Sequence, residues 1–304
     1  MARSFEQIYN DAPRAAVGRL LAFRERYIPK YEERHGKLYR VWDVNEAKEP
    51  LGTLVFLPSA MGHGEIWFPY MLDMRDRYRL ITISLADDED PQLLTSALLD
   101  ILSGLGVDKM MIAANSVGGL LAQIMAQRAP ERVKGLALMM TGCPGEDLSP
   151  AIRQNWELRR KLKRRFRFQS YSPGQKLSMA NNLFDSICPE KYRDNSLFWL
   201  GYIEETFAES VYKAQHIAIN TALVPNIYSN YRLKAENFSG DLAVLIAESA
   251  DDKLYSPEEK ACLKALHPRA EIVDLGEGGQ FALQLHEQLV TEVLSAFAQK
   301  VFGA

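Results

Sequence analysis

One serine lies in a stretch whose residue types could supply a nucleophile. Met110 to Ala113 is a short apolar run that suits a buried parallel strand, and residues 120–129 carry apolar side chains at helical spacing. Between them the chain reads A-N-S-V-G around Ser116, close to the pattern G-x-S-x-G, in which a serine hydroxyl at a tight strand-to-helix turn attacks a carbonyl carbon. The turn requires small residues two before and two after the serine, and Ala114 and Gly118 meet this requirement. The alternative is an ordinary serine near a helix N-terminus, where Ser and Gly are common.

Alternating strands and helices are expected to position this turn. Residues 5–34 form a polar, partly helical lead-in, and a helix is predicted to begin at Pro91. Apolar or alternating runs predict four strands besides the one before Ser116, of which the first would lie at the sheet edge: Leu38 to Val44, Thr53 to Leu57, Tyr78 to Leu85 and Lys134 to Met140. This order predicts an α/β fold with a mostly parallel sheet and helices on both faces.

Residues 146 to about 238 interrupt the alternation with helical periodicity and many aromatic side chains. The α/β pattern then returns with a strand after Asp241, a helix at Pro257 to Leu266, a strand at 271–275 and a final helix from about Leu283 to Val301. We expect a core of residues 1–145 and 239–304, with a helical cap of residues 146–238 over the carboxyl ends of the strands. Ligands bind at that edge of open α/β sheets, so a small apolar or acyl ligand is expected under the cap.

The order of elements resembles the α/β-hydrolase fold along nearly the whole chain. More narrowly, five segments are similar to the maspardin-like branch of that superfamily: FRERYIP at 23–29, PSAMGHG at 58–64, ISLADDED at 83–90, ANSVGG at 114–119 and GEGGQF at 276–281. The superfamily resemblance implies serine-hydrolase chemistry on an ester or acyl compound, with nucleophile, acid and histidine in that chain order.

The acid of such a triad is expected just beyond the strand LAVLIAES at 242–249. Asp251 and Asp252 both lie there, before the helix that begins at Pro257. The spacing to the helix favours Asp252 as the acid, with Asp251 as its neighbour. Paired aspartates before a helix are also common turn and cap residues, which is the structural alternative.

The histidine of the triad is missing from its expected place. The resemblance puts it in the loop after the last strand, where Gln280 stands instead. An amide has no nitrogen that titrates near neutral pH, so Gln280 can hydrogen-bond but cannot take the serine proton. Members of the maspardin-like branch are also implied to depart from histidine here. An introduced substitution at position 280 is the minor alternative.

Five histidines remain as possible substitutes for that base. His63 lies in the loop expected to form the oxyanion hole, and His216 lies in the predicted cap, so either could be a relocated base. His35, His267 and His286 are expected to be structural or solvated. For every one of the five, a packed or solvated role is the simpler hypothesis.

Backbone groups are expected to bind the oxyanion of an acyl intermediate. The resemblance places these N–H donors at Val117, after the nucleophile, and at Ala60, with Met61 as the next candidate. Gly62 and Gly64 would allow their loop to approach closely. Because backbone donors survive side-chain changes, this feature does not separate an active site from a retired one.

Composition limits the remaining possibilities. The chain of 304 residues is 47% apolar, enough for one large core, and its net charge of -3 gives no pull toward nucleic acid. The three cysteines match no metal or redox spacing, and this count suggests a reducing compartment. With no apolar run of membrane-spanning length, we expect a cytoplasmic protein without a cofactor. The basic segment 159–167 is either a solvated face or a surface for an acidic protein partner.

Overall fold

An eight-stranded sheet forms the centre of the molecule in the computed structural model, which describes residues 3–163, 192, 196–208 and 219–303. The strand order is β1-β2-β4-β3-β5-β6-β7-β8, and all neighbours from β4 to β8 pair in parallel. The strands are β1 (Lys30–Arg34), β2 (Lys37–Val44), β3 (Thr53–Leu57), β4 (Arg79–Ile83), β5 (Met110–Asn115), β6 (Val133–Met139), β7 (Ala243–Glu248) and β8 (Glu271–Asp274). The expected mostly parallel sheet is therefore confirmed.

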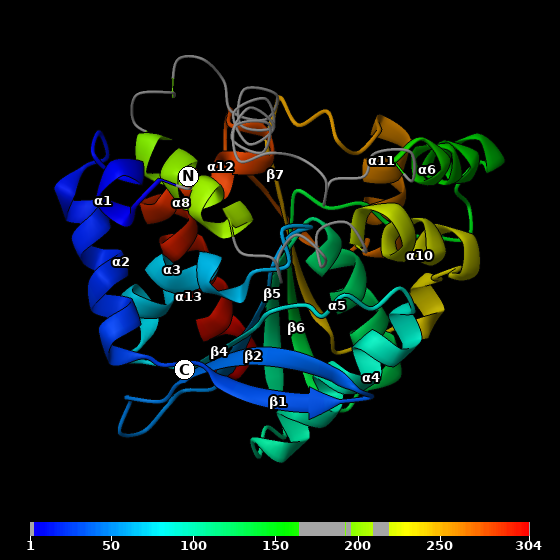
Figure 1. The fold of residues 1–304 in the computed structure, drawn as a ribbon. Helices are drawn as coiled ribbons and strands as arrows, with labels where there is room; N and C mark the ends of the chain where they lie inside the picture. The colour runs from blue at the N-terminus through cyan, green and yellow to red at the C-terminus, as the bar shows by residue number, and fades with distance from the viewer. Residues whose placement is uncertain (1–2, 164–191, 193–195, 209–218, 304) are drawn as a thin grey trace.

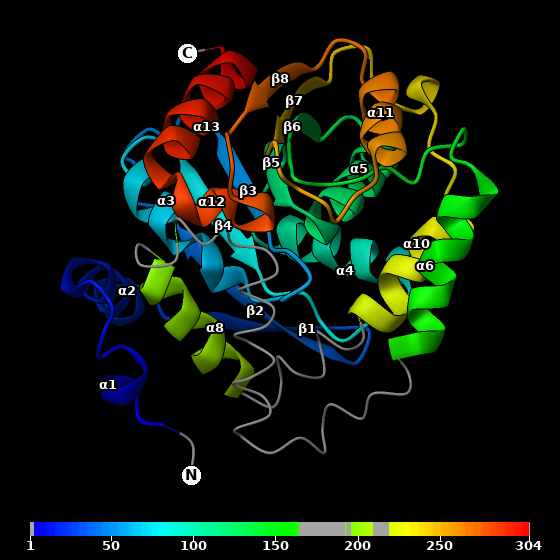
Figure 2. The ribbon, with the colours of Figure 1, turned by 90° about the horizontal axis from the view of Figure 1, so that it is seen from above.

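Helices cover both faces of this sheet (Figures 1 and 2). One face packs against α4 (Pro91–Gly104), α5 (Val117–Arg128) and α11 (Pro257–Leu266), and the other against α3 (Phe68–Met74) and α13 (Glu287–Phe302). Successive residues of a strand point to opposite faces, so both faces of a central strand need apolar side chains. In β5, Ile112 packs in one hydrophobic cluster and Ala113 in the other, which explains its continuous apolar run.

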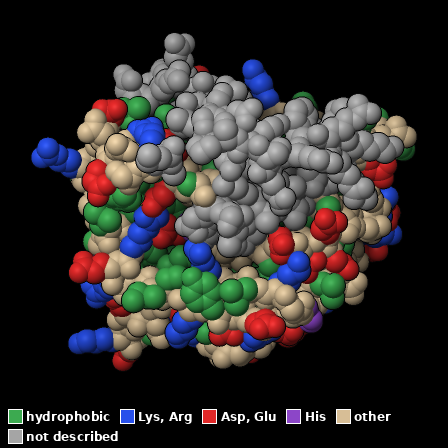
Figure 3. Space-filling view, viewed as in Figure 1, with side chains coloured by type: hydrophobic (Ala, Val, Ile, Leu, Met, Phe, Trp, Pro, Cys, Tyr) green, Lys and Arg blue, Asp and Glu red, His purple; other side chains and the backbone are tan. Residues whose placement is uncertain are grey.

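The N-terminal lead-in differs from its prediction. It contains α1 (Phe5–Ile8) and α2 (Arg14–Arg26), as a partly helical segment should, but it ends in strand β1. β1 pairs antiparallel with β2, so β2 lies inside the sheet and its predicted edge position is wrong. The sequence KYEER of β1 lacks the apolar pattern by which a strand is predicted, because a strand at the edge of a sheet needs no apolar face. Tyr31 in β1 and Leu38 in β2 are 55% and 56% exposed, and Figure 3 shows hydrophobic side chains on the surface over this hairpin.

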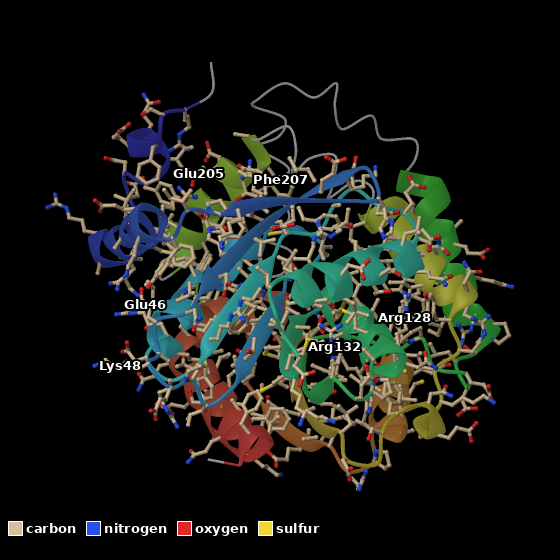
Figure 4. All side chains as sticks on the ribbon, turned by 90° about the horizontal axis from the view of Figure 1, so that it is seen from below. Glu46, Lys48, Arg128, Arg132, Glu205 and Phe207 are labelled. Carbon is tan, nitrogen blue, oxygen red and sulfur yellow. The ribbon has the colours of Figure 1, made fainter. Side chains whose placement is uncertain are left out.

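Most other boundaries fall close to their predictions. β3 and α11 have the expected ends, and β4 is shorter than the predicted segment 78–85. The last helix is divided into α12 (Ala282–Leu285) and α13, with His286 between them. Arg128 and Arg132, labelled in Figure 4, connect the end of α5 to α4 and to the loop after it, because they donate to the carbonyls of Gln92 and Val107.

The described part of segment 146–238 is helical, with one isolated bridge between Gly145 and Leu233. Figure 2 shows α8 on the α2 side of the molecule, and α6 and α10 together on the side of α11. The described helices of segment 146–238 are α6 (Pro150–Lys163), α8 (Leu197–Ala208), η5 (Ile219–Leu223), α10 (Val224–Asn230) and the short η6 (Ala235–Asn237). The division of the chain into a core and a cap domain stays a prediction. Among the described residues, no helix has both the length and the hydropathy needed to cross a membrane.

Candidate active site

Ser116 occupies a strained turn between β5 and α5. Its φ of 54° and ψ of -118° are unusual for a residue with a side chain, as expected for a nucleophile elbow. A Cβ atom added to Gly118 would lie 2.6 Å from the carbonyl oxygens of Leu57 and Pro58. Only glycine therefore lets α5 begin this close to the end of β3.

The neighbouring strand β6 fixes the same turn from its other side. The Ser116 N–H donates to the carbonyl of Met139 at 3.0 Å, and the Thr141 hydroxyl donates to the Ser116 carbonyl at 2.6 Å. A Cβ atom on Gly119 would lie 2.6 Å from the Thr141 hydroxyl oxygen. Two glycines and two backbone hydrogen bonds thus determine where the Ser116 side chain points.

The Ser116 hydroxyl lies 3.3 Å from the hydroxyl of Tyr255. Both side chains are buried, with 3% of each residue exposed. Burial raises the pKa of Tyr255, although its hydrogen bond with Ser116 lowers it, and the nearby carboxylates of Glu259 and Asp252 raise it further. The phenol is therefore protonated at neutral pH, so it can hydrogen-bond to Ser116 but cannot accept the serine proton.

Sequence reasoning missed Tyr255. It lies in the loop between β7 and α11, three residues after Asp252, where the sequence predicted only an acid. Gly142 allows its approach to the site, because a Cβ atom there would lie 2.5 Å from the Tyr255 ring. Gly142 is a sequence feature that indicates a close contact at this position, but it does not specify that the side chain in contact is Tyr255.

The two aspartates of this loop have different partners. The Asp251 Oδ1 atom accepts hydrogen bonds from the N–H groups of Gly278 and Gly279, at 2.9 and 2.8 Å, in the loop that carries Gln280. Asp252 Oδ1 instead accepts from the N–H of Leu254 at 2.9 Å, within its own turn. Asp251 therefore bonds to the loop in which the fold would carry its histidine, and the assignment of Asp252 as the acid stays a prediction.

Hydrogen bonds keep Asp251 ionised. Partial burial raises the pKa of its carboxyl, but hydrogen bonds from the Ser249 hydroxyl and from Gly279 and Gly278 lower it more, so the net pKa is below the ordinary value. The Ser249 hydroxyl donates to Oδ1 at 2.8 Å. Asp252 is almost fully buried, and its Oδ2 atom lies 3.9 Å from the Lys260 ammonium group.

The Gln280 side chain points toward the end of β6. Its Nε2 atom donates to the carbonyl of Met140 at 3.1 Å. Met140 has a φ of 41°, so its backbone is also in a conformation that side chains rarely adopt. Gln280 thus lies in the loop next to Asp251 and is bonded to the backbone one residue after Met139, which anchors Ser116.

His63 is buried in a separate network. Its Nδ1 atom lies 2.7 Å from the Tyr202 hydroxyl, which lies 3.2 Å from a carboxylate oxygen of Glu65. A carboxylate only accepts, so Tyr202 donates to Glu65 and His63 Nδ1 donates to Tyr202. Burial, with the charges of Arg40 and Arg24, holds the pKa of His63 well below its ordinary value, so the ring is neutral.

This network ends in a half-buried arginine, Arg24. Arg24 binds both carboxylate oxygens of Glu65, at 2.9 and 2.8 Å, and also binds Glu205 at 2.8 Å. Glu205, labelled in Figure 4, comes from α8, so Arg24 connects α2 to both the η1 turn (Gly64–Trp67) and α8. These contacts link His63 to α2 and α8, and its use as a relocated base stays a prediction.

The remaining histidines have varied positions. His35 lies in the β1–β2 turn, and His267 ends α11, where burial lowers its pKa to about 4. His286 precedes α13, and its Nε2 atom lies 2.7 Å from the carbonyl of Glu277. His216, the other predicted relocated base, lies outside the described residues.

The expected oxyanion donors lie on two neighbouring segments. Val117 is the first residue of α5, where N–H groups have no partner within the helix, and Ala60 and Met61 lie in the loop after β3. That loop is fixed at both glycines, because Leu85 N–H donates to the Gly62 carbonyl at 2.8 Å and Gly64 N–H donates to the Ser84 hydroxyl at 3.0 Å. The use of these donors as an oxyanion hole stays a prediction.

Two further expectations concern ions and charge. The described residues contain no group of three or more His, Cys, Asp or Glu side chains placed to hold a metal ion. The basic segment 159–167 begins in the last turn of α6, and its side chains lie outside the described part of the chain. An acidic partner at that segment therefore stays a prediction.

Comparison with known proteins identifies relatives of this chain. A family model described as alpha/beta hydrolase fold matches residues 93–286. An uncharacterized carboxylesterase from Bacillus subtilis is 28% identical over 117 residues, which are 35% of this chain and 38% of that protein. Epoxide hydrolase 1 from Caenorhabditis elegans is 26% identical over 136 residues, 40% of this chain and 33% of that protein. The chain thus matches less than two fifths of the length of either relative.

Solved structures give the same fold over a larger part of the chain. A thermophilic esterase from Thermogutta terrifontis superposes with a TM-score of 0.69 and 17% identity, over 91% of this chain and 99% of that one. At this identity the likeness concerns the fold alone. Together with the family match, it confirms the predicted fold class.

Proposed function

The chain belongs to the α/β-hydrolase fold family, and on that premise we propose that it has a serine-hydrolase-type pocket for an ester or acyl compound. In this pocket Ser116 is the nucleophile, and Gln280 stands at the position of the triad histidine. The observation that carries the proposal is the contact of Ser116 with a protonated phenol, Tyr255, at 3.3 Å, in an otherwise intact elbow.

The chemistry follows from these contacts. For acylation, the Ser116 oxygen attacks a carbonyl carbon and its proton must leave. Neither the Gln280 amide nor the protonated Tyr255 can take that proton, so it passes to water, which makes hydrolysis weak, or to a relocated base. The N–H groups of Val117 and Ala60, with Met61 as the next candidate after Ala60, would stabilise the oxyanion. The names of the relatives, a carboxylesterase and an epoxide hydrolase, support a hydrolase-type reaction.

A histidine elsewhere in the chain could act as the base for Ser116, and this form of the proposal needs its own test. His63 donates through Nδ1 to Tyr202 and belongs to the Arg24 network, so its contacts favour a structural role. His216 stays a prediction from the sequence. If either is the base, its replacement by alanine lowers turnover by two or more orders of magnitude, as about 10²-fold is the lower range for acid–base catalysis.

A non-catalytic binding protein is the second candidate. It is favoured by the hydrogen bonds of Asp251 and Gln280. Both side chains bond to backbone groups, as structural residues do: Asp251 to the N–H groups of Gly278 and Gly279, and Gln280 to the carbonyl of Met140. The maspardin-like resemblance supports the same candidate. Such a protein would hold a small apolar ligand under the cap or an acidic partner at segment 159–167, in the cytoplasm.

The test is covalent labelling of the full chain with a fluorophosphonate, together with hydrolysis of short-chain nitrophenyl esters. The proposal predicts slow labelling at Ser116 and weak ester hydrolysis, both lost in Ser116→Ala with the circular dichroism spectrum unchanged. If the folded wild-type chain is not labelled and its ester hydrolysis equals that of Ser116→Ala, the proposal is wrong and the binding protein is the better account.

A further inference from the structure

Two cysteines far apart in the sequence meet beside the sheet. The sulfur atoms of Cys143 and Cys262 lie 3.4 Å apart, although 119 positions separate them in the chain. Both are free thiols. Cys143 lies in the segment after β6 and is fully buried, whereas Cys262 lies on α11 and is partly exposed.

The space beside them admits a small reagent. Cys262 lines a cavity of about 480 Å³, together with Gly145, Glu146, Leu233 and Glu258. Cys143 does not line this cavity. The pair therefore has one thiol that a solute can reach and one that lies behind it.

Gly145 lies directly against both sulfur atoms. A Cβ atom at this position would collide with the Cys262 sulfur and lie 3.0 Å from that of Cys143, so only glycine fits. The guanidinium group of Arg153 donates to the carbonyls of Gly145 and Tyr228, which places a positive charge beside the pair.

These contacts distinguish the two thiols. The hydrogen bond that Cys262 shares with Cys143 and the charge of Arg153 lower the pKa of Cys262, against the opposing effect of burial. The same pairing and burial raise the pKa of Cys143. Cys262 lines the cavity and Cys143 lies behind it, so Cys262 is the thiol that a solute reaches first and whose thiolate reacts.

We propose that Cys143 and Cys262 form a redox-active dithiol that reacts with hydroperoxides. The Cys262 thiolate attacks the nearer peroxide oxygen, the O–O bond breaks, and the other oxygen leaves as water or an alcohol after taking a proton. Cys262 becomes a sulfenic acid. The Cys143 sulfur then attacks the Cys262 sulfur, water leaves, and a disulfide remains. In sum, two thiols are oxidised to a disulfide and one peroxide is reduced.

This proposal is independent of any catalysis by Ser116. It agrees with the low cysteine count, because disulfides in a reducing compartment are transient and redox-sensing rather than structural. The expected disulfide would join α11 to the segment after β6, and a thiol reductant would reverse it.

The experiment treats the reduced full chain with hydrogen peroxide and identifies its products by mass spectrometry after proteolysis. The proposal predicts a peptide pair joined through Cys143 and Cys262, which disappears with dithiothreitol. Cys188→Ser is the matched control and should leave the joined pair unchanged. Cys143→Ala should stop at a Cys262 sulfenic acid that dimedone labels, and Cys262→Ser should leave Cys143 unmodified.

Two results would overturn the proposal. One is the absence of a Cys143–Cys262 disulfide at peroxide concentrations that oxidise free N-acetylcysteine, in protein with an unchanged circular dichroism spectrum. The other is dimedone labelling of Cys143 in the Cys262→Ser variant, which would show that the reactive thiol is Cys143 instead. The presence or absence of the Cys143–Cys262 disulfide is measured in the wild-type and Cys188→Ser proteins, so this test remains available even if a Cys143 variant does not fold.

Discussion

The turn at Ser116 and the loop that carries Gln280 are held in place by different kinds of contact. Around Ser116, backbone contacts fix the geometry, since Gly118 touches the end of β3 and Thr141 bonds to the Ser116 carbonyl. In the loop after β8, the same fold position carries Gln280, which bonds to the Met140 carbonyl. A change at Gly118 disturbs the packing of α5 on the sheet, whereas a change at Gln280 removes one hydrogen bond to the Met140 carbonyl.

If Gln280 stands at the histidine position, as proposed, this difference explains how a hydrolase fold can keep its elbow without the base. The turn is part of the folded core, so its loss would destabilise the protein whether or not the serine reacts. The histidine position contributes one hydrogen bond to the backbone, which an amide supplies equally well. Retention of Ser116 is therefore weak evidence for catalysis, and the partners of its hydroxyl are the more informative observation.

The largest expected effect in this comparison belongs to Gly118. Gly118→Ala places a methyl group against two backbone carbonyls, so the free energy of unfolding should fall by about 3 to 4 kcal/mol. Urea denaturation measures this change. Gly240→Ala is the matched control, because no atom lies within 4 Å of its added Cβ, and it should change stability by less than about 0.5 kcal/mol. Equal effects in the two variants would show that the turn is not fixed by packing.

The buried histidine His267 tests the role of histidines outside the site. Its pKa is about 4 in the folded chain, against 6.5 as the ordinary value. The unfolded chain binds the proton of this imidazole more readily than the folded chain does. The contribution of neutral His267 to the free energy of unfolding is therefore fully present above pH 6.5 and is lost as the pH falls toward 4. The loss should be about 3 kcal/mol, because each pH unit between the folded and unfolded pKa values corresponds to about 1.4 kcal/mol.

Urea denaturation at several pH values, compared between the wild type and His267→Gln, measures this contribution. The His267→Gln variant should not lose this contribution as the pH falls, so its free energy of unfolding should depend less on pH, by about 3 kcal/mol. The rate of Ser116 labelling should not follow the titration of His267 in either protein. An inflection of the labelling rate near pH 6.5 that His267→Gln does not remove would instead indicate a histidine base at the site.

Asp251, the neighbour of the predicted acid Asp252, tests whether a carboxylate of this loop serves the structure. Asp251→Ala removes a carboxylate that accepts from Gly278, Gly279 and Ser249, so the free energy of unfolding should fall by about 2 kcal/mol. Asp274→Ala, which removes an acceptor for the single N–H of Gly276, should cost about 0.5 kcal/mol. If Asp251→Ala has no effect on stability, the carboxylate is not needed for the loop and a catalytic role becomes the better explanation.

The smallest expected effect concerns the pair of hydroxyl groups. Tyr255→Phe and Ser116→Ala each remove one side of the 3.3 Å contact, and a double-mutant cycle should give a coupling energy of about 1 kcal/mol. Thermal and urea unfolding of the four proteins supply the values. A coupling energy near zero would mean that Tyr255 does not restrain the Ser116 hydroxyl.

Local sequence patterns predicted much of the fold. The apolar run of β3 and the proline and capping serine before α11 define those elements without tertiary information. β1 was missed because the polar sequence KYEER pairs at an open edge, where only backbone bonding defines the strand. The turn at Ser116 was found because its small residues are consecutive in the chain.

The missed parts of the site depend on contacts between distant segments. Spacing placed both Asp251 and Asp252 in one loop but could not determine which carboxylate faces Gly278 and Gly279. Tyr255 reaches Ser116 across 139 positions, and Cys143 reaches Cys262 across 119, so neither pair has a local pattern. In each case the direction of a side chain follows from the packing of α11 on the sheet.

The most direct test of the central claim is the rate at which a fluorophosphonate labels Ser116 in Gln280→His, relative to the wild type and to Gln280→Asn. If Ser116 lacks only a base, the histidine variant should react about 10²-fold faster, and the asparagine variant should react like the wild type. A histidine variant that folds normally and reacts no faster than the wild type would contradict the claim that the elbow is intact and only its base is missing.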